Sequence, residues 1–367
     1  PPPPPPPPPP PFFFNHHPAI RHFCLSRGLG DVYKRQPNAR AKKWGQCMRV
    51  LLTGAAGFIG ANVAKALIAE GHRVLGVDNI NDYYDVSLKH HRLEQLTQLP
   101  SFEFVNVELS DTNATAALFL EGAFDWVIHL AAQAGVRYSI DNPQAYVASN
   151  LIGFQNILEQ VRIHPPTHFV FASSSSVYAN SKRSIFSETD PTDDPASLYA
   201  ATKKSNEVVS HSYAKLYGVP MTGLRFFTVY GPAGRPDMAY FSFTDNILNG
   251  RPIKVFNHGN LERDFTFIDD IVSGVIGACE HPPTELEIPH RILNLGNKQP
   301  VKLGHFIATL ESLCERDAVK ELVDMQPGDV HRTCANIDAA QQLFGFCLLY
   351  TSPSPRDRQK SRMPSCG

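Results

Sequence analysis

The chain is poor in cysteine, and its few cysteines are not arranged to hold a metal ion. The 367 residues include seven cysteines, which form no CxxC pair and no Cys/His spacing typical of zinc ligands. Small disulfide scaffolds depend on many closely spaced cysteines, which this chain lacks. We therefore expect neither a metal site nor a disulfide framework.

The sequence also lacks an excess of charge of one sign and any long apolar run. The 34 Lys and Arg residues almost balance the 35 Asp and Glu residues, giving a net charge of -1. Proteins that bind nucleic acid through many phosphate contacts are basic, so we expect no nucleic-acid partner. No stretch approaches the roughly 20 apolar residues that span a bilayer, and the N-terminus has no secretory signal pattern. These absences predict a cytoplasmic protein without a membrane partner.

Proline is abundant, but it is concentrated at one end of the chain. Residues 1–11 are all proline, a run that forms extended polyproline II and buries no core. A globular pattern begins at Met48, and residues 347–367 again lack a hydrophobic period. We expect residues 1–47 to be a non-native or disordered extension and residues 347–367 to be a non-native tail. A disordered extension with a binding role is the alternative for the N-terminal segment.

A dinucleotide-binding motif opens the globular region. Residues 50–53 have the pattern of a short buried strand, and residues 54–60 (GAAGFIG) lead into an amphipathic helix that ends near Glu70. Glycines in such a loop allow a tight turn, close approach of the backbone to a pyrophosphate and close helix–strand packing. The start of the helix adds N–H groups and a positive dipole end. We predict that the cofactor contacts Gly54, Gly57, Phe58, Ile59 and Gly60.

An acidic residue follows the next strand. The strand at residues 73–77 ends in Asp78, which lies 18 residues after Gly60. A carboxylate at this point accepts hydrogen bonds from the adenosine ribose hydroxyls and repels a 2′-phosphate, so the sequence predicts NAD rather than NADP. The alternative is that Asp78 is a solvated turn residue.

Strands and helices alternate along the next 150 residues, and this pattern predicts an α/β fold with a doubly wound parallel sheet (Rossmann-like). From Gly231 to about Phe346 the elements become shorter, which predicts a smaller C-terminal α/β substrate lobe. We therefore expect an NAD-binding domain at residues 48–230 and a mainly substrate-binding lobe at residues 231–346. The further elements expected before Gly231 are strands at 102–107, 126–130 and 168–173 and helices at 112–120, 145–162 and 197–217.

A tyrosine and a lysine four residues apart form the candidate catalytic pair. Tyr199 and Lys203 share one face of the predicted helix. A free phenol has a pKa near ~10 and is a poor base at neutral pH, but a neighbouring ammonium favours the phenolate. The serines at 173–176 follow a predicted strand and offer a hydroxyl for the reacting oxygen. An ordinary surface pair is the alternative for Tyr199 and Lys203.

Several motifs together resemble one known family. Between Met48 and about Phe346 the chain is similar to extended short-chain dehydrogenases/reductases of the nucleotide-sugar epimerase group, and most similar to UDP-glucuronate 4-epimerases. The resemblance rests on TGAAGFIG, HLAAQAGVRYS, FASSSSVY, YAATK, LRFFTVYGP, VFNHGN, RDFTFIDD and QPGDV. It implies an NAD-dependent isomerase that inverts C4 of a UDP-sugar, acts in polysaccharide biosynthesis, and binds the nucleotide sugar mainly through residues 231–346.

By position, the catalytic triad of the family falls on Ser174, Tyr199 and Lys203. The resemblance implies that Tyr199 takes the proton of the sugar 4-hydroxyl while the C4 hydride passes to NAD. The 4-keto sugar then turns about its diphosphate link, and the hydride returns to its opposite face. NAD remains bound through each cycle. Besides Tyr199 and Lys203, the resemblance implies cofactor contacts for Ala131, Ala132, Gln133 and Asn150.

The residues after the triad hydroxyl indicate the substrate. Dehydratases and decarboxylases of the family carry acidic residues there, whereas this chain has Ser175 and Ser176, whose hydroxyls suit a sugar carboxylate. Thr228 stands where UDP-glucose 4-epimerases usually have Asn. The resemblance therefore implies conversion of UDP-glucuronate to UDP-galacturonate, with Arg263 on the diphosphate. The full set of implied substrate contacts is Ser174, Ser175, Ser176, Thr228, Arg235, Arg263 and Asp329.

Several alternatives stay open at this point. The enzyme alternatives are a UDP-glucose 4-epimerase and a UDP-glucuronate decarboxylase, and the non-enzyme alternative is a catalytically silent NAD-binding protein. Ser175, Ser176 and Thr228 can also serve only to satisfy backbone groups. The family implies a homodimer that pairs helices 145–162 and 197–217. The chain departs from the family at Ala179, at Glu108 near the adenine, at Asn336, and after Phe346, where the final helix of the family is replaced.

Overall fold

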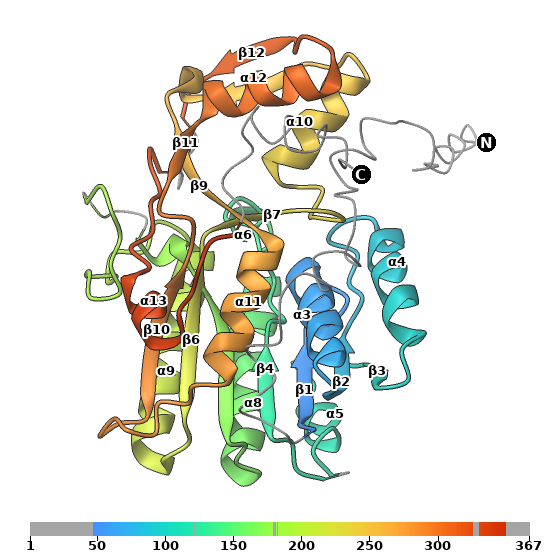
Figure 1. Cartoon of the computed structure of the whole chain (residues 1–367), viewed down its shortest axis with the longest axis vertical. Coiled ribbons are helices and arrows are strands. Elements are labelled where there is room, and N and C mark those ends of the chain that lie inside the picture. Colours follow the sequence, from blue (N-terminus) through green and yellow to red (C-terminus); the bar gives the residue numbers. More distant parts are fainter. Residues whose placement is uncertain (1–46, 121, 179–180, 182, 326–329, 350–367) are drawn as a thin grey trace, which may run out of the picture.

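The computed structural model describes residues 47–120, 122–178, 181, 183–325 and 330–349. The expected N-terminal extension, most of the expected tail, Ala179 and Asp329 lie outside the described residues. In Figure 1 a large sheet flanked by helices fills the lower part of the molecule, and a smaller group of helices and short strands lies above its upper edge.

The large sheet has seven strands, and every neighbouring pair is parallel. Its order is β10-β6-β5-β4-β1-β2-β3, which confirms the expected doubly wound, Rossmann-like fold. The strands are β1 (Arg49–Thr53), β2 (Arg73–Asp78), β3 (Phe102–Asn106), β4 (Trp126–His129), β5 (His168–Ser174), β6 (Met221–Phe226) and β10 (His290–Leu295).

Helices cover both faces of this sheet because side chains alternate between the faces along each strand. On β1, Val50 and Leu52 pack with α3, α4, α11 and α13, whereas Leu51 between them packs with α8 and α9 on the opposite face. The helices of the first layer are α3 (Phe58–Ala69), α4 (Val86–Thr97), α11 (Ile268–Cys279) and α13 (Asp338–Phe344). Those of the second layer are α5 (Thr112–Ala117), α8 (Gly153–Ile163) and α9 (Leu198–Tyr217).

The order of the strands reverses between β1 and β4, and this reversal places the binding crevice. From β1 the chain moves outward to β2 and β3, and from β4 it moves the other way to β5 and β6. The segments that leave β1 and β4 therefore diverge, and ligands of such folds bind where they part. The loops that follow these strands begin at Gly54 and Leu130.

The smaller group of elements comes from the part of the chain between residues 228 and 323. It holds a three-stranded sheet (β11-β9-β7), a two-stranded sheet (β12-β8) and a separate apolar cluster beneath α10 and α12. Its elements are β7 (Thr228–Tyr230), α10 (Ala239–Leu248), β8 (Ile253–Phe256), η3 (Asn257–Gly259), β9 (Glu262–Phe267), β11 (Pro300–Lys302), α12 (Leu303–Cys314) and β12 (Lys320–Val323). Because α11, β10 and α13 return to the large sheet, residues 231–346 are divided between the two parts.

Two helical regions differ from the sequence expectation. The helix expected at 145–162 begins as α7 (Pro143–Tyr146), passes through a π-helical turn, η1 (Val147–Ile152), and continues as α8. The second difference is α4, a largely polar helix whose weak apolar pattern gave no prediction. The remaining short elements are α6 (Tyr138–Asp141) and the 3-10 turn η2 (Ser175–Tyr178).

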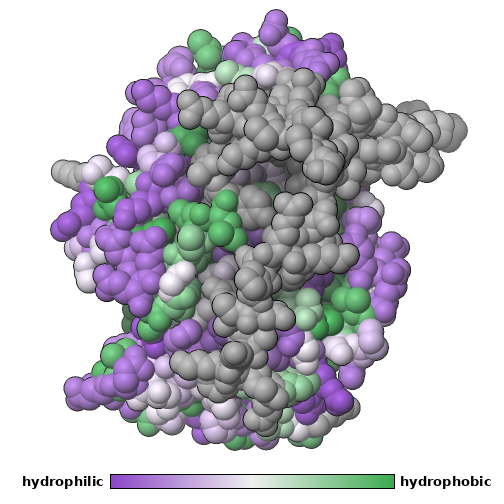
Figure 2. Space-filling view, viewed as in Figure 1, coloured by the Kyte–Doolittle hydropathy of each residue, from purple (hydrophilic) through white to green (hydrophobic). Residues whose placement is uncertain are grey.

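The described surface is mostly hydrophilic on the face shown in Figure 2, where hydrophobic residues gather in small groups. None of the helices within the described ranges combines the length and the apolar character needed to cross a bilayer. Over the same residues, no cluster of three or more His, Cys, Asp or Glu side chains is placed to hold a metal ion.

Candidate active site

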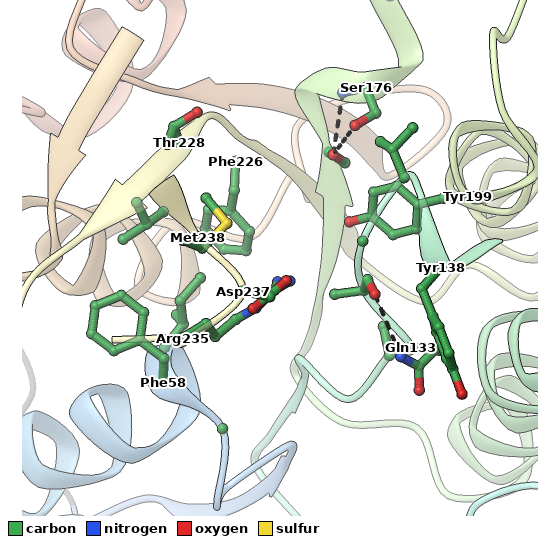
Figure 3. Close-up of a pocket in the computed structure, with 18 of the residues that line it drawn as sticks. Phe58, Gln133, Tyr138, Ser176, Tyr199, Phe226, Thr228, Arg235, Asp237 and Met238 are labelled. Carbon is green, nitrogen blue, oxygen red and sulfur yellow. Dashed lines mark hydrogen bonds and ion pairs between the residues drawn. The ribbon is translucent and has the colours of Figure 1, made fainter. Parts of the chain in front are cut away.

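A cavity of about 920 Å³ lies where the loops after β1 and β4 part, below the smaller group of elements. Ligand sites in proteins commonly occupy roughly 300–1,000 Å³, so this space holds a large ligand or two adjoining ones. Figure 3 shows Tyr199 and Ser176 on one side and Thr228 and Arg235 on the other, with the Tyr199 hydroxyl directed into the space between them. The predicted cofactor and substrate residues thus surround one cavity.

The glycine-rich loop is packed so closely that side chains are excluded. A Cβ on Gly54 would lie 2.7 Å from the backbone nitrogen of Ala131, and one on Gly60 would lie 2.1 Å from the carbonyl oxygen of Gly54. Gly54 also has a φ of +75°, in the left-handed region that favours glycine. Helix α3 begins after Gly57 with no side-chain cap, and its first residues line the cavity. The start of α3 therefore faces the ligand space, as an anion site requires.

Asp78 is the last residue of β2, and its carboxylate lies beside the glycine-rich loop. Its two oxygens accept hydrogen bonds from the backbone N–H groups of Ala56 at 3.1 Å and Ile80 at 2.9 Å. Lys89 on α4 lies 3.9 Å away as an ion-pair partner. Asp78 is buried and lines the cavity, which is incompatible with the solvated turn residue considered above. It holds the loop in shape, and its direct contact with a ribose stays a prediction.

The loop after β4 lines the cavity with Ala131, Ala132 and Gln133, as the resemblance implies. Asn150 does not line the cavity but contacts this loop. Its side-chain oxygen accepts the Gln133 N–H at 2.8 Å, and its amide donates to the Gln133 carbonyl at 3.0 Å. Asn150 belongs to the π-helical turn η1, a distortion that often occurs at functional sites. The structure thus gives Asn150 a role in holding Gln133, and its direct contact with the cofactor stays a prediction.

Tyr199 lies in the first turn of α9, which is capped by the Ser197 side chain accepting the Ala200 N–H at 3.1 Å. The phenol borders the cavity, and Tyr199 is half-buried. Burial raises the pKa of Tyr199, whereas a hydrogen bond with Ser174 and the positive charge of Arg235 lower it. Two groups that favour the phenolate therefore face the phenol from opposite sides of the cavity.

Lys203 lies one turn further along the same face of α9. Its Nζ donates to the carbonyl oxygen of Ala172 on β5 at 2.9 Å. Burial lowers the pKa of Lys203 to about 8, while the charge of Glu207 acts in the opposite direction. Lys203 is thus mainly protonated at neutral pH. The influence of Lys203 on the phenol, expected from the sequence, stays a prediction because the Nζ is bonded to the backbone here.

The serines after β5 turn into the cavity in a compact arrangement. Ser174 Oγ donates to Ser176 Oγ at 3.1 Å and accepts the Ser176 N–H at 3.2 Å. Ser174, Ser175 and Ser176 all line the cavity, since the 3-10 turn η2 begins directly after the strand. This turn therefore presents hydroxyls, with no carboxylate, to a ligand beside Tyr199.

The opposite side of the cavity holds the remaining predicted substrate residues. Thr228 begins β7, and Arg263 lies in β9 with an Nη1 that donates to the Glu262 carbonyl at 3.0 Å. Arg235 forms a two-pronged ion pair with Asp237, with N–O distances of 3.0 and 2.5 Å. Thr228, Arg235 and Arg263 all line the cavity, and Asp329 lies outside the described residues. The structure therefore brings every described substrate residue to the same space.

With this geometry in place, comparison with known proteins identifies the family. The sequence profile of the NAD dependent epimerase/dehydratase family matches residues 50–296. The chain belongs to this family.

Similar proteins include epimerases of two substrates. A probable UDP-glucuronate 4-epimerase from Rhizobium meliloti (strain 1021) is 47% identical over 313 residues, covering 82% of this chain and 92% of that protein. The crystal structure of UDP-glucuronic acid 4-epimerase from Bacillus cereus with UDP-glucuronic acid and NAD matches with a TM-score of 0.77 at 33% identity, covering 83% and 95% of the chains. A UDP-glucose 4-epimerase from Thermotoga maritima with UDP-glucose has a TM-score of 0.73 at 26% identity, covering 83% and 94%. These matches confirm the resemblance seen in the sequence.

The residues of this epimerase/dehydratase chain fit a dinucleotide. The glycine-rich loop leaves no room for a Cβ at Gly54 or Gly60, and this brings bare backbone and the uncapped start of α3 to the cavity wall. Asp78 marks one end of the space, next to Glu108, whose carboxylate accepts hydrogen bonds from Asn79 and Ser110. This set combines an anion site with an acidic group at the end of the next strand, β2, as in the NAD-binding motif.

Sequence reasoning missed several residues that connect the two sides of the cavity. Arg92 on α4 is buried and donates to the carbonyl oxygens of Ala56 at 3.0 Å and Ala233 at 2.7 Å. Tyr83 donates to Asp237 at 3.2 Å. The segment after β2 thus contacts the loop that carries Arg235. No sequence signal marked these residues, because Ala233 and Asp237 lie more than 140 positions away from Arg92 and Tyr83 in the chain.

Proposed function

We propose that the protein is an NAD-dependent 4-epimerase that converts UDP-glucuronate to UDP-galacturonate. One observation carries this proposal: Tyr199, Ser174 and Lys203 border the same cavity as the glycine-rich loop, beside a turn whose polar side chains are all hydroxyls. When bound, NAD supplies a hydride acceptor and donor for C4 of the sugar. The glycine-rich loop, Asp78 and the loop at Ala131–Gln133 are the residues that would hold it.

Tyr199 is the proposed acid and base. Its phenol oxygen takes the proton from the 4-hydroxyl and later returns a proton to the same oxygen. The Ser174 hydroxyl and the Arg235 charge both lower the pKa of Tyr199, which opposes the effect of burial and makes the phenolate easier to form. Lys203, charged at neutral pH, adds a cation within one helical turn.

The hydroxyls of the η2 turn support a uronic acid as the substrate. Ser175 and Ser176 can donate hydrogen bonds to a sugar carboxylate. Thr228 lies across the cavity from Ser176 (Figure 3). A carboxylate side chain at these positions would repel such a substrate. The turn also lacks the acidic group that a dehydratase or decarboxylase of the family would place there, so the sugar is not driven beyond its 4-keto form.

The opposite side of the cavity supports recognition of a nucleoside diphosphate. Arg263 and Arg235 carry guanidinium groups, which match phosphate geometry with two parallel donors. Both line the cavity with Lys254 and with Phe256, an aromatic surface for a base. We include Asp329 as a further contact on the uridine side, on the resemblance alone. The aromatic face and the cations together suit a UDP group whose sugar reaches toward Tyr199.

Product analysis with the two candidate substrates tests this function. The purified chain is incubated separately with UDP-glucuronate and UDP-glucose, and the nucleotide sugars are separated by chromatography. We expect UDP-galacturonate from the first and little UDP-galactose from the second. UDP-galactose as the main product would assign the protein to UDP-glucose 4-epimerases, and a pentose product would indicate decarboxylation. No conversion with NAD added would overturn the proposal.

We further propose a cytoplasmic homodimer that uses the outer faces of α8 and α9. Apolar side chains are exposed along these helices: Ile163 at 52%, Val208 at 57% and Leu216 at 67%. A second copy that pairs the same helices by two-fold symmetry would cover them. We also propose that residues 48–230 serve mainly the cofactor and residues 231–346 mainly the nucleotide sugar. Sedimentation of wild type and Val208→Asp tests the dimer, since a buried carboxylate should shift it to monomer.

A further inference from the structure

One face of α9 carries three polar side chains at intervals of one turn. Tyr199, Lys203 and Glu207 follow one another at four-residue spacing, so they form a single row along the helix. Tyr199 and Lys203 belong to the proposed reaction. Glu207 lies outside the cavity lining and is buried, with 5% of its surface exposed.

This row meets three consecutive residues at the carboxyl end of β5. Lys203 donates to the Ala172 carbonyl at 2.9 Å and Glu207 accepts the Ser173 hydroxyl at 2.5 Å. At the start of the row, the Ser174 side chain acts on the Tyr199 phenol and lowers its pKa, and both residues line the cavity. The contacts fix how far α9 is displaced along β5. Since Ser173 and Ser174 are neighbours in the strand, the Glu207 contact bears directly on the position of the Ser174 hydroxyl.

A buried arginine holds the Glu207 carboxylate in place. Arg225 on β6 donates from Nε and Nη2 to the two carboxylate oxygens, each at 2.8 Å. Both side chains are at most 5% exposed, so the pair is shielded from solvent. A two-pronged arginine–carboxylate contact restricts orientation as well as distance. Glu207 is therefore directed toward β5 by the neighbouring strand.

The same arginine reaches the far end of the hydroxyl turn. Arg225 Nη1 donates to the Tyr178 hydroxyl at 2.6 Å, and Tyr178, the last residue of η2, donates to Asn294 on β10 at 2.8 Å. The η2 turn carries Ser175 and Ser176 between this anchor and Ser174. The ion pair is thus connected to the helix that carries Tyr199 and to both ends of the turn that carries the serines.

We propose that Glu207, held by Arg225, is a positioning residue that sets the register between α9 and β5 and so places Tyr199 against Ser174. The inference rests on the proposed epimerase function for its kinetic readout. A displacement of about 1 Å at reacting groups can lower a rate by about a hundredfold, so loss of this register should lower kcat and leave substrate binding nearly unchanged.

Two serine variants provide a matched test. Ser173→Ala removes the hydroxyl that joins Glu207 to β5. The control is Ser210→Ala. Ser210 is also buried and lies on α9, the helix that carries Glu207, but its hydroxyl contacts His290 at 3.0 Å and donates to the Glu207 backbone carbonyl. For each variant and wild type, kcat and KM for UDP-glucuronate, retained NAD, the C4 deuterium isotope effect and the melting temperature are measured. The rate of amide hydrogen exchange at residues 198–204 is measured in parallel, because this measurement needs no substrate.

We expect Ser173→Ala to lower kcat about tenfold with KM and retained NAD within about twofold, and to increase both the isotope effect and exchange at 198–204. Ser210→Ala should change kcat by less than about twofold, even where the two melting temperatures fall equally. Glu207→Gln, which keeps the shape but unpairs Arg225, should lower kcat further. If Glu207→Gln does not fold, the comparison of Ser173→Ala with Ser210→Ala tests the proposal alone.

An unchanged kcat in Ser173→Ala, or a loss that Ser210→Ala shares, would overturn the positioning role. Equal rates of amide hydrogen exchange at residues 198–204 in the two serine variants would also overturn it. Failure of the proposed function looks different, because wild type itself would then convert no UDP-sugar. The exchange comparison still tests the register between α9 and β5 in that case.

Discussion

The two sides of the cavity are built in different ways. On the α9–β5 side, Ser173, Lys203 and Glu207 are buried and bonded to one another's elements through short contacts. On the β7–β9 side, Arg235 and Arg263 are half-buried; Arg235 pairs with Asp237, and Arg263 donates to the carbonyl oxygens of Glu262 and His331. The polar groups of the first side are therefore less exposed than the guanidinium groups of the second. The proposed function places the chemistry on the first side and the recognition of the nucleotide on the second.

Removing the Tyr199 hydroxyl should give the largest effect, and the effect should be on chemistry alone. Tyr199→Phe leaves the ring in place but removes the proposed acid and base, so we expect kcat to fall by at least about a thousandfold. Retained NAD and substrate affinity should stay near the wild-type values, which calorimetry and absorbance measure. Turnover close to wild type would show that the α9–β5 side does not hold the base.

An arginine variant on the other side should produce the opposite pattern. Arg263→Ala removes the charge-assisted contact proposed with the diphosphate, and such contacts contribute about 1.5–3 kcal/mol, so KM should rise roughly tenfold to a hundredfold. The kcat at saturating substrate should change little. Initial-rate kinetics separate the two constants, and a fall in kcat with unchanged KM would contradict the division between the two sides.

The hydroxyl turn lies between these two sides and should affect the choice of substrate. Ser175→Ala combined with Ser176→Ala removes two donors to a sugar carboxylate, so kcat/KM for UDP-glucuronate should fall about tenfold. Any conversion of UDP-glucose should be affected less, since that sugar has no carboxylate. Parallel assays with both substrates measure the ratio, and equal losses for the two sugars would remove the proposed carboxylate contact.

Among the variants considered, we expect the smallest effect on turnover from a change at His168, at the end of β5 far from Ser174. His168 is the first residue of this strand, and burial lowers its pKa to about 4 from the ordinary 6.5. The unfolded chain therefore binds a proton between these pH values that the folded chain does not. This group's contribution to stability is present above pH 6.5 and is lost as the pH falls toward 4, by about 3 kcal/mol at pH 4.5.

A His168→Gln variant isolates that contribution. Urea unfolding at pH 7 and pH 4.5 should show a smaller loss of unfolding free energy on acidification than in wild type, while kcat at pH 7 stays within about twofold. The variant keeps the similar contributions of His129 and His290, whose pKa values burial lowers to about 3 and about 4. An identical acid sensitivity in both proteins would exclude His168 as a source.

The fold and much of the site were predictable because their signals are local. A strand, a glycine loop, a helix and Asp78 follow one another within 30 residues, and Tyr199 and Lys203 share a helical turn. The contacts that hold these groups were not predictable in the same way. Arg225 joins Glu207 across 18 positions and Tyr178 across 47, and only the packed sheet brings them together. Likewise, polar α4 left no clear period, although its Arg92 joins the two sides of the cavity.

The central claim is that hydride leaves and re-enters the same sugar carbon beside Tyr199. Its most direct test is to supply UDP-glucuronate carrying deuterium at C4 and to determine the label in both C4 isomers by mass spectrometry and NMR. We predict that the label stays at C4 in substrate and product, with none exchanged into water. Loss of the C4 deuterium to solvent during conversion, or its appearance at another carbon, would contradict the account.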